Sequence, residues 1–343
     1  MLRTNFVIDK KVLGDEVLTQ IFTSGNKTVY PFIFDVDYGA MKSINCYIID
    51  DGHTKILIDG GIARDPYYEF FTAQLTTYGL SYDCIDTIIL THHHEDHIGI
   101  VNEVLAIKEV PIYAYNSAIE RLQFDEAYLK NKLLFFEQLY KDYGCYDKAQ
   151  DRLDKLKQTI QNGKHKKINA NIIPLYVGDI VNGLEVIHMP GHSPDSILLY
   201  DNETKWAFSG DLVFKYGTSN ALIDFDKNKA LLPTAQQQMN SLRKCQQLSI
   251  SMMFPGHQLP FADYVEVTQF YIDRIEQKCH RLVAAILEGN TTVLELAYAI
   301  YGEKTDQVFS LVMSEVIGYV MYAKRKGYIK GEKGEDGWTF EGK

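Results

Sequence analysis

Four side chains that can bind a metal ion lie within six consecutive positions of the chain: His92, His94, Asp96 and His97. His92 and His94 are separated by one residue, and in an extended or tightly turned backbone such residues point to the same side. Asp96 and His97 are adjacent and can face a second ion nearby. Imidazole and carboxylate groups are ligands that zinc and similar ions accept. The run at 91–99, THHHEDHIG, therefore predicts a metal-binding loop.

The elements around this loop should place it at the carboxyl end of a strand. Residues 87–90 (TIIL) have the pattern of a buried strand, and 45–49 and 55–59 are further short strands bounded by Gly-containing turns. Strand patterns dominate from about Phe6 to Ala114, with one helix predicted at 67–78, and they return at 172–175, 184–188, 197–200 and 206–209. Two residues of the loop, His93 and Glu95, alternate with the candidate ligands, so we expect them to be structural or solvent-facing.

A helical segment interrupts the strand pattern at about 117–163, where Leu recurs at helical spacing among Lys, Glu and Gln. We predict two helices broken near Tyr143 and Gly144. Its place in the chain allows this insert to cover the metal site as a lid, and its aromatic residues could line an apolar pocket for an acyl chain. Alternatively, these aromatics pack against the core or against a second copy in a homodimer. They are Phe124, Tyr128, Phe135, Phe136 and Tyr140.

The chain beyond about residue 262 changes to a helical pattern. Helices are predicted at 264–287, 292–301 and 307–326, followed by a hairpin between 328 and 340. Three helices followed by a two-stranded wing are typical of a winged-helix module. The sequence thus predicts a catalytic domain at 1–262 and a winged-helix-like domain at 263–343.

Composition restricts the function classes. The 343 residues include 46% hydrophobic and 23% charged residues, as in a globular protein with a substantial core, and the formal net charge is −10. An acidic chain disfavours tight non-specific nucleic-acid binding, and the basic residues of 291–343 are offset by acids. The five cysteines are scattered, which suits reduced thiols. With neither a leader peptide nor an apolar run of membrane-spanning length, we expect a cytoplasmic protein.

Five motifs in chain order resemble those of the metallo-β-lactamase superfamily over about residues 6–261. The run THHHEDHIG is similar to the HxHxDH signature of that family. The other four are IDGG at 58–61 with Asp59, PGHSP at 190–194 with His192, FSGD at 208–211 with Asp211, and FPGH at 254–257 with His257.

The resemblance implies an α/β fold, the four-layer αββα sandwich of the metallo-β-lactamases, here with a helical insert and a C-terminal domain. It also implies two divalent metal ions: zinc first, with manganese or iron as alternatives. Their shared hydroxide would attack the substrate, Asp96 would orient it and return a proton to the leaving group, and Asp59 would support the metal loop from behind the ligands. The first ion would take His92, His94 and His192, the second Asp96, His97 and His257, with Asp211 between them.

The residues after Asp211 bear on the substrate. GDLVFKYG at 210–217 is similar to the GDxxFxxG stretch of glyoxalase II-like thioesterases, but Ser219-Asn220 replaces the Gly-Arg pair that follows in that group. Phe214 stands where related lactonases have a tyrosine that holds the substrate carbonyl, so Tyr216 is the predicted substrate contact.

The sequence therefore predicts a dinuclear hydrolase of a small ester, thioester or lactone. Two alternatives stay open. The first is a single-strand endoribonuclease or phosphodiesterase of the same superfamily. The second is a non-catalytic winged-helix regulator with a metal-sensing domain, against which the balanced charge of the C-terminal region argues.

Overall fold

The structure is a computed structural model that describes residues 20–36 and 41–343. The strand pattern predicted from Phe6 and the prediction about a leader peptide lie partly or wholly on residues 1–19, outside the described residues. Within the described part, no helix has both the length and the apolar character needed to cross a membrane. All five cysteines are described, and each is unpaired, as the sequence predicts.

Two sheets form the centre of the fold within residues 20–36 and 41–343. The first has seven strands in chain order, antiparallel from β1 to β4 and parallel from β4 to β7. The second has five strands in the order β12-β11-β10-β9-β8, of which only β11 and β12 pair in parallel. The strands are β1 (Phe22–Ser24), β2 (Lys27–Asp35), β3 (Ser43–Asp50), β4 (Lys55–Ile58), β5 (Thr87–Leu90), β6 (Ile112–Tyr115), β7 (Ile172–Leu175), β8 (Ile180–Val181), β9 (Leu184–His188), β10 (Ile197–Asp201), β11 (Trp206–Gly210) and β12 (Met252–Pro255).

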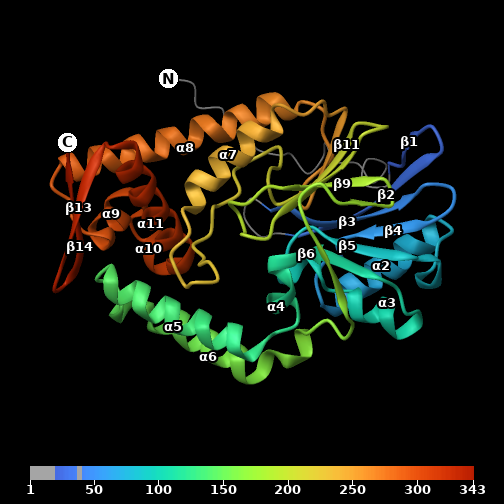
Figure 1. The fold of residues 1–343 in the computed structure, drawn as a ribbon, viewed down its shortest axis with the longest axis horizontal. Helices are drawn as coiled ribbons and strands as arrows, with labels where there is room; N and C mark the ends of the chain where they lie inside the picture. The colour runs from blue at the N-terminus through green and yellow to red at the C-terminus, as the bar shows by residue number, and fades with distance from the viewer. Residues whose placement is uncertain (1–19, 37–40) are drawn as a thin grey trace.

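Helices cover the outer face of each sheet (Figure 1). Apolar side chains of both sheets, among them Ile58 and Phe208, form the buried cluster between the sheets. A second cluster joins the first sheet to α2 (Asp65–Thr77) and α3 (Val101–Ile107). A third joins the second sheet to α7 (Thr234–Cys245) and α8 (Tyr264–Leu287). This is the predicted four-layer αββα sandwich, and the fold prediction is confirmed.

The insert contains the predicted break between two long helices. Helix α5 (Glu126–Asp142) ends at Tyr143, and Gly144 adopts φ +64°, a left-handed conformation that glycine allows at little cost. Around these helices lie a short α4 (Ile119–Leu122), α6 (Gln150–Asn162) and the 3₁₀ turns at Tyr82–Cys84, Glu95–His97, Asn116–Ala118, Asp147–Ala149 and Gly163–Lys166.

The C-terminal elements largely follow the prediction. After α8 come α9 (Val293–Tyr301), α10 (Lys304–Gln307), α11 (Phe309–Lys326) and the hairpin β13 (Ile329–Gly334) with β14 (Gly337–Gly342). Helix α9 begins at a capping box in which Thr292 and Glu295 satisfy each other's backbone N–H groups. The predicted third helix begins two residues late, because α10 precedes it. The assignment as a winged-helix module stays a prediction.

The insert and the C-terminal region contact each other, as Figure 1 shows below and beside α11. Asp142 pairs with Lys333 at 2.8 Å, and Lys148 pairs with Asp306 at 3.0 Å. Both regions also share the apolar cluster that covers the second sheet. The domain boundary at 262/263 stays a prediction, and the shared core provides a way to test it.

Candidate metal centre

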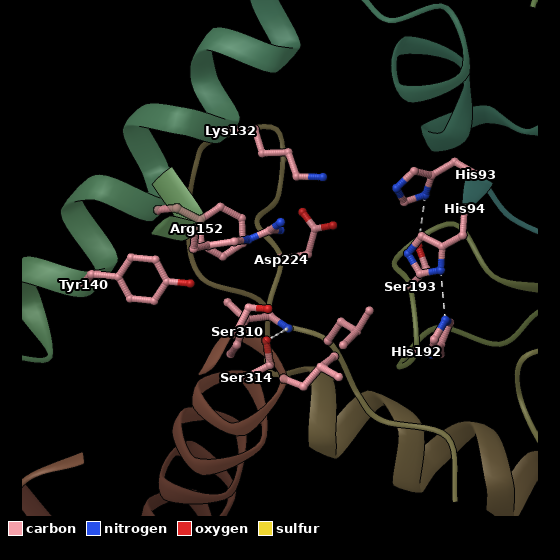
Figure 2. Close-up of a pocket in the computed structure, with 14 residues that line it drawn as sticks. His93, His94, Lys132, Tyr140, Arg152, His192, Ser193, Asp224, Ser310 and Ser314 are labelled. Atoms are coloured by element: carbon pink, nitrogen blue, oxygen red, sulfur yellow. Dashed lines mark hydrogen bonds between the residues drawn. The ribbon is translucent and has the colours of Figure 1, made fainter. Parts of the chain in front are cut away.

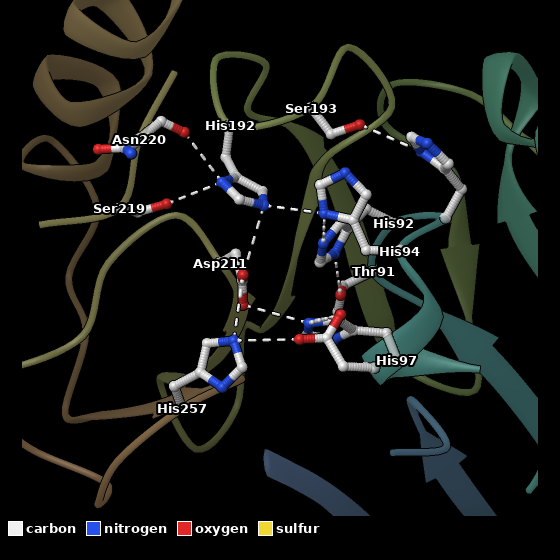
Figure 3. Close-up of polar contacts among 12 residues, drawn as sticks. Thr91, His92, His94, His97, His192, Ser193, Asp211, Ser219, Asn220 and His257 are labelled. Carbon is white, nitrogen blue, oxygen red and sulfur yellow. Dashed lines mark hydrogen bonds and ion pairs between the residues drawn. The ribbon is translucent and has the colours of Figure 1, made fainter. Parts of the chain in front are cut away.

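The predicted ligands follow the carboxyl ends of strands that run in the same direction. The metal-binding loop follows β5, His192 lies beyond β9, Asp211 directly follows β11, and His257 lies two residues beyond β12. Strands β11 and β12 are parallel, and β9 has the same direction because β10 is antiparallel to both β9 and β11. The side chains therefore meet at one edge of the sandwich (Figure 3).

Three imidazole rings form the first group of potential ligands. The Nε2 atoms of His92 and His192 lie 3.0 and 2.9 Å from Nδ1 of His94. These ring nitrogens are close enough to share one ion at bond lengths of roughly 2.0–2.1 Å. The residues are the three that the sequence assigns to the first metal.

Asp96, His97 and His257 form the second group. The 3₁₀ turn at Glu95–His97 directs Asp96 and His97 away from the preceding pair of histidines. Asp96 Oδ2 lies 3.6 Å from His257 Nε2, and Asp96 Oδ1 lies 4.0 Å from His97 Nε2. The sequence assigns these residues to the second metal.

Asp211 lies between the two groups. Its Oδ1 is 3.2 Å from His97 Nε2, while its Oδ2 is 3.2 Å from His257 Nε2 and 3.4 Å from His192 Nε2. One carboxylate thus contacts histidines of both groups, which is the position that the sequence predicts for it.

Asp59 supports the loop from behind, where the sequence places it. Its carboxylate accepts hydrogen bonds from the Thr91 N–H and hydroxyl groups, both at 2.8 Å, and from His97 Nδ1 at 2.8 Å. Because an ionised carboxylate only accepts, His97 must carry its proton on Nδ1 when neutral, and its Nε2 lone pair then faces the centre.

Two backbone carbonyls orient the other distant histidines in the same way. His192 Nδ1 donates to the Asn220 carbonyl at 2.9 Å, and His257 Nδ1 donates to the Ser43 carbonyl at 2.6 Å. Each bond leaves the Nε2 lone pair directed toward the centre, an arrangement typical of metal-binding histidines.

Burial and charge set the protonation of the centre. Burial lowers the pKa of His92 and of His94 well below the usual value, so both rings are neutral at pH 7. Burial opposes the charged form of His97 as well, but the carboxylates of Asp59 and Asp211 outweigh it and raise the His97 pKa. Burial opposes ionisation of Asp211, yet His257 and His97 hold its pKa well below the ordinary range. The two carboxylates thus favour a positive charge at this point.

The residues present fit divalent metal ions. His97 Nε2 and Asp211 Oδ1 are buried without a hydrogen-bond partner, and such atoms in a native structure require an explanation. At Gly256 a Cβ atom would lie 2.6 Å from Asp211 Oδ1 and 2.6 Å from His97 Cε1, so only glycine leaves this space open. Five imidazoles and two carboxylates around it are a donor set that suits zinc, manganese or iron.

Three other residues weighed from the sequence lie outside this cluster. His93 Nδ1 is 2.8 Å from Asp195 and its side chain is only 12% exposed, whereas Glu95 is exposed and pairs with Lys166. His93 is thus structural rather than solvent-facing. The Tyr216 backbone bonds to the Gln258 side chain, and Tyr216 does not line the cavity beside the centre. Its predicted substrate contact stays a prediction.

A cavity of about 280 Å³ opens beside the first group of ligands (Figure 2). His94 and His192 form part of one wall, and helices α5, α6 and α11 supply others. Phe136 and Tyr140 line it, as the lid prediction expects, but Lys132, Arg152 and Asp224 line it too. The cavity is therefore not the apolar pocket predicted from the aromatic residues alone.

Sequence reasoning missed two features of this site. Asp195 is buried and holds His93 through both its carboxylate oxygens, and its only signal is its place three residues after His192. Lys132 and Arg152 carried no signal, because charged residues on predicted amphipathic helices usually face solvent.

Replacing Asp59 with alanine should weaken metal binding by about 10- to 100-fold, the range found when a partner behind a metal ligand is removed. The reason is that His97 and Thr91 lose the acceptor that orients them. Chelator competition measures the change. Asp65→Ala, an exposed substitution in the first turn of α2, is the control and should bind metal normally. Equal affinities of the two variants would contradict the role of Asp59.

The family comparison matches most of the sandwich. Residues 41–257 match the model of the family described as the metallo-beta-lactamase superfamily. That range includes the metal-binding loop and Asp59, His192, Asp211 and His257.

Curated proteins are similar over most of the chain. A probable metallo-hydrolase, YqjP of Bacillus subtilis, is 23% identical over 285 residues, covering 82% of this chain and 88% of YqjP. A protein of Aspergillus fumigatus called atrochrysone carboxyl ACP thioesterase is 23% identical over 315 residues, covering 87% of this chain and 82% of its own.

Solved structures share the fold at low sequence identity. The metallo-beta-lactamase family protein TTHA1429 of Thermus thermophilus superposes with a TM-score of 0.72 at 19% identity, over 92% of this chain and 98% of its own. A beta-lactamase domain protein of Burkholderia ambifaria also gives 0.72, at 15% identity, over 95% and 96%. The likeness extends beyond the sandwich to most of the insert and C-terminal region.

Proposed function

The chain belongs to the metallo-β-lactamase superfamily, and from this premise we propose that it is a dinuclear metal-dependent hydrolase of a small ester, thioester or lactone. One observation carries the proposal. Seven side chains of the ligand types that divalent metals accept converge within hydrogen-bonding or ion-pair distance, beside a cavity of about 280 Å³. The relative named as a metallo-hydrolase supports the reaction class.

We assign His92, His94 and His192 to one ion and Asp96, His97 and His257 to the other, with Asp211 in contact with both sets. When bound, two divalent ions supply Lewis acidity that activates water and stabilises developing negative charge. Zinc is the ion to test first, with manganese and iron beside it, because imidazole and carboxylate ligands accept all three.

The residues of the chain provide orientation and proton transfer. The bonds to Asp59, Ser43 and Asn220 hold three imidazoles with Nε2 toward the centre, so little reorganisation is needed for binding. The Asp96 side chain is 21% exposed, whereas Asp211 is 8% exposed. Asp96 is thus the carboxylate that water reaches, and we assign to it the positioning of the attacking water and the return of a proton to the leaving group.

A thioester is the first substrate class to test. The relative called atrochrysone carboxyl ACP thioesterase supports it, as does the similarity of 210–217 to glyoxalase II-like thioesterases. The cavity volume, about 280 Å³, is close to the lower bound of pockets that hold small molecules.

The test is hydrolysis by purified protein loaded separately with zinc, manganese or iron. A panel of thioesters, lactones and aryl esters is assayed, with single-stranded RNA as the alternative substrate. We expect turnover of at least one small ester, loss of that turnover after chelation, and recovery when metal is restored. Cleavage of RNA alone would replace the proposal with the nuclease alternative. No turnover of any substrate by the metal-loaded protein would overturn it.

A further inference from the structure

The cavity beside the metal centre has an unusual charge distribution for this acidic chain. Two of its lining residues are cationic, Lys132 of α5 and Arg152 of α6, and both are largely buried. They lie on the walls formed by the insert, across from His94 and His192, and Figure 2 shows the Lys132 ammonium group extending into the space toward His93. The formal net charge of the whole chain is −10, so this local excess of cations contrasts with the rest of the molecule.

The single carboxylate in the lining does not compensate these cations. Asp224 is held by Arg121, whose Nη1 donates to Oδ2 at 2.8 Å and whose Nη2 donates to Oδ1 at 3.3 Å. Arg121 therefore neutralises Asp224 from outside the cavity lining. Lys132 and Arg152 remain as two positive charges in excess.

Neither cation has an ion-pair partner among the described residues. The Lys132 ammonium group has no carboxylate within 4.0 Å in the part of the chain that the structure describes, and its printed neighbour is the Tyr128 ring, 6.0 Å away. The guanidinium of Arg152 lies 5.6 Å from the Phe136 ring and beside the Tyr140 hydroxyl, and its Nε is buried without a hydrogen-bond partner. Burial of unpaired charge is costly, so cations retained in this way require a counter-charge.

Two further observations point to an anion. Burial lowers the pKa of Lys132 to about 8, because Asp224 only partly offsets the cost of keeping the ammonium group charged away from water. The amino end of α11, an 18-residue helix with no acidic residue in its first turn, also reaches the cavity through Ser310. The positive end of the helix dipole favours an anion there.

We propose that Lys132 and Arg152 bind an anionic group of the substrate, a carboxylate or a phosphate, while the bond to be cleaved lies at the metal centre. This inference rests on the proposed function and narrows it from esters in general to acidic ones. The two cations act as specificity-determining residues: they select and position the substrate and take no part in the cleavage itself.

The first experiment compares matched substrates. In the carboxylate arm, a succinyl thioester is paired with its neutral methyl ester on the same thiol. In the phosphate arm, an acetyl thioester whose leaving group carries a phosphate is paired with the same thioester carrying a hydroxyl group. The wild-type protein should prefer the anionic member of at least one pair by roughly 10- to 100-fold in kcat/KM, as a charge-assisted hydrogen bond implies. The arm that shows the preference identifies the anion.

Variants locate the preference. Lys132→Met and Arg152→Met should each remove most of it, mainly through KM, and Lys132→Arg should retain it. Lys130→Met and Lys157→Met are matched controls, because these lysines lie on the same helices and are 62% and 45% exposed in pairs with Glu126 and Asp154. Both controls should keep the wild-type preference. If Lys132→Met does not fold, Lys132→Gln and Arg152→Met carry the comparison.

A binding measurement separates this inference from the proposed function. Calorimetry measures the affinity of succinate and of inorganic phosphate for the metal-loaded protein, and at least one anion should bind about 10-fold or more weakly to Lys132→Met than to Lys130→Met. If that difference appears without turnover of any ester, the proposed function is wrong and the anion site stands. If esters are hydrolysed with no preference for an anionic member, and Lys132→Met binds both anions like Lys130→Met, the inference is overturned and the hydrolase stands.

Discussion

Replacing Asp211 with asparagine should remove hydrolysis almost completely and leave at most one metal ion per chain. Asp211 is the one side chain that contacts histidines of both ligand groups, at 3.2 to 3.4 Å. An amide has nearly the same shape, but it lacks the negative charge and the second acceptor oxygen. Loss of a partner behind a ligand costs about 10- to 100-fold in metal affinity or activity, so loss of a group that contacts both sites should exceed about 100-fold.

Elemental analysis and the thioester assay measure the two effects together. Glu95→Gln is the matched control, since Glu95 lies in the same loop and pairs with Lys166 on the surface. This control should keep both metals and full activity. Circular dichroism shows whether each variant is folded. A folded Asp211→Asn protein with two metals and normal turnover would contradict the assignment of Asp211 to the space between the two ions.

Ile317→Ala should lower the stability of the whole chain by about 2–5 kcal/mol, the usual cost of removing a fully buried isoleucine side chain. Ile317 lies on α11 and has no exposed surface. The cluster that contains it also includes residues of the insert, of α7 and of the second sheet, such as Met239 and Leu198. Because that core is continuous, we expect one unfolding transition, and the substitution should shift all of it.

Two signals recorded during denaturation distinguish one cooperative unit from two domains. Far-ultraviolet circular dichroism reports the helices, and loss of bound metal reports the catalytic site. Both should shift together in Ile317→Ala, while Leu287→Ala, at a side chain that is 68% exposed, should change neither by more than about 0.5 kcal/mol. A metal-release curve that stays at the wild-type position would show instead that residues 263–343 unfold as a separate domain.

The sequence alone was sufficient for the fold because several independent signals agreed. Residues 91–99 and four later motifs occur in the order of one family, and the αββα sandwich expected from that family is present. The break at Gly144 and the long helix from Tyr264 to Leu287 were also predicted, since turn residues and helical periodicity are local properties. In contrast, α3 (Val101–Ile107) was missed, because seven residues rich in Val and Ile do not distinguish a short helix from a strand.

The chemical types of the candidate ligands are likewise written in the sequence, but their convergence is not. His92 and His94 are neighbours in the chain, whereas His192, Asp211 and His257 reach them only because β9, β11 and β12 end at the same edge of the sandwich as β5. Which ring nitrogen faces the centre depends on contacts such as that between His257 and the Ser43 carbonyl, which are non-local.

The cavity depended on the tertiary structure most of all. Its walls come from the insert, the 222–224 loop and α11, and no local pattern indicates that these segments meet. On its own helix Lys132 is indistinguishable from Lys130, and only the packing around α5 makes one of them a largely buried cation in the cavity and the other an exposed partner of Glu126. Residue types and spacing thus determined the metal-binding chemistry in advance. The charge of the space beside it depends on which distant side chains folding brings together, because burial, and with it the cost of an unpaired charge, exists only once the chain is packed.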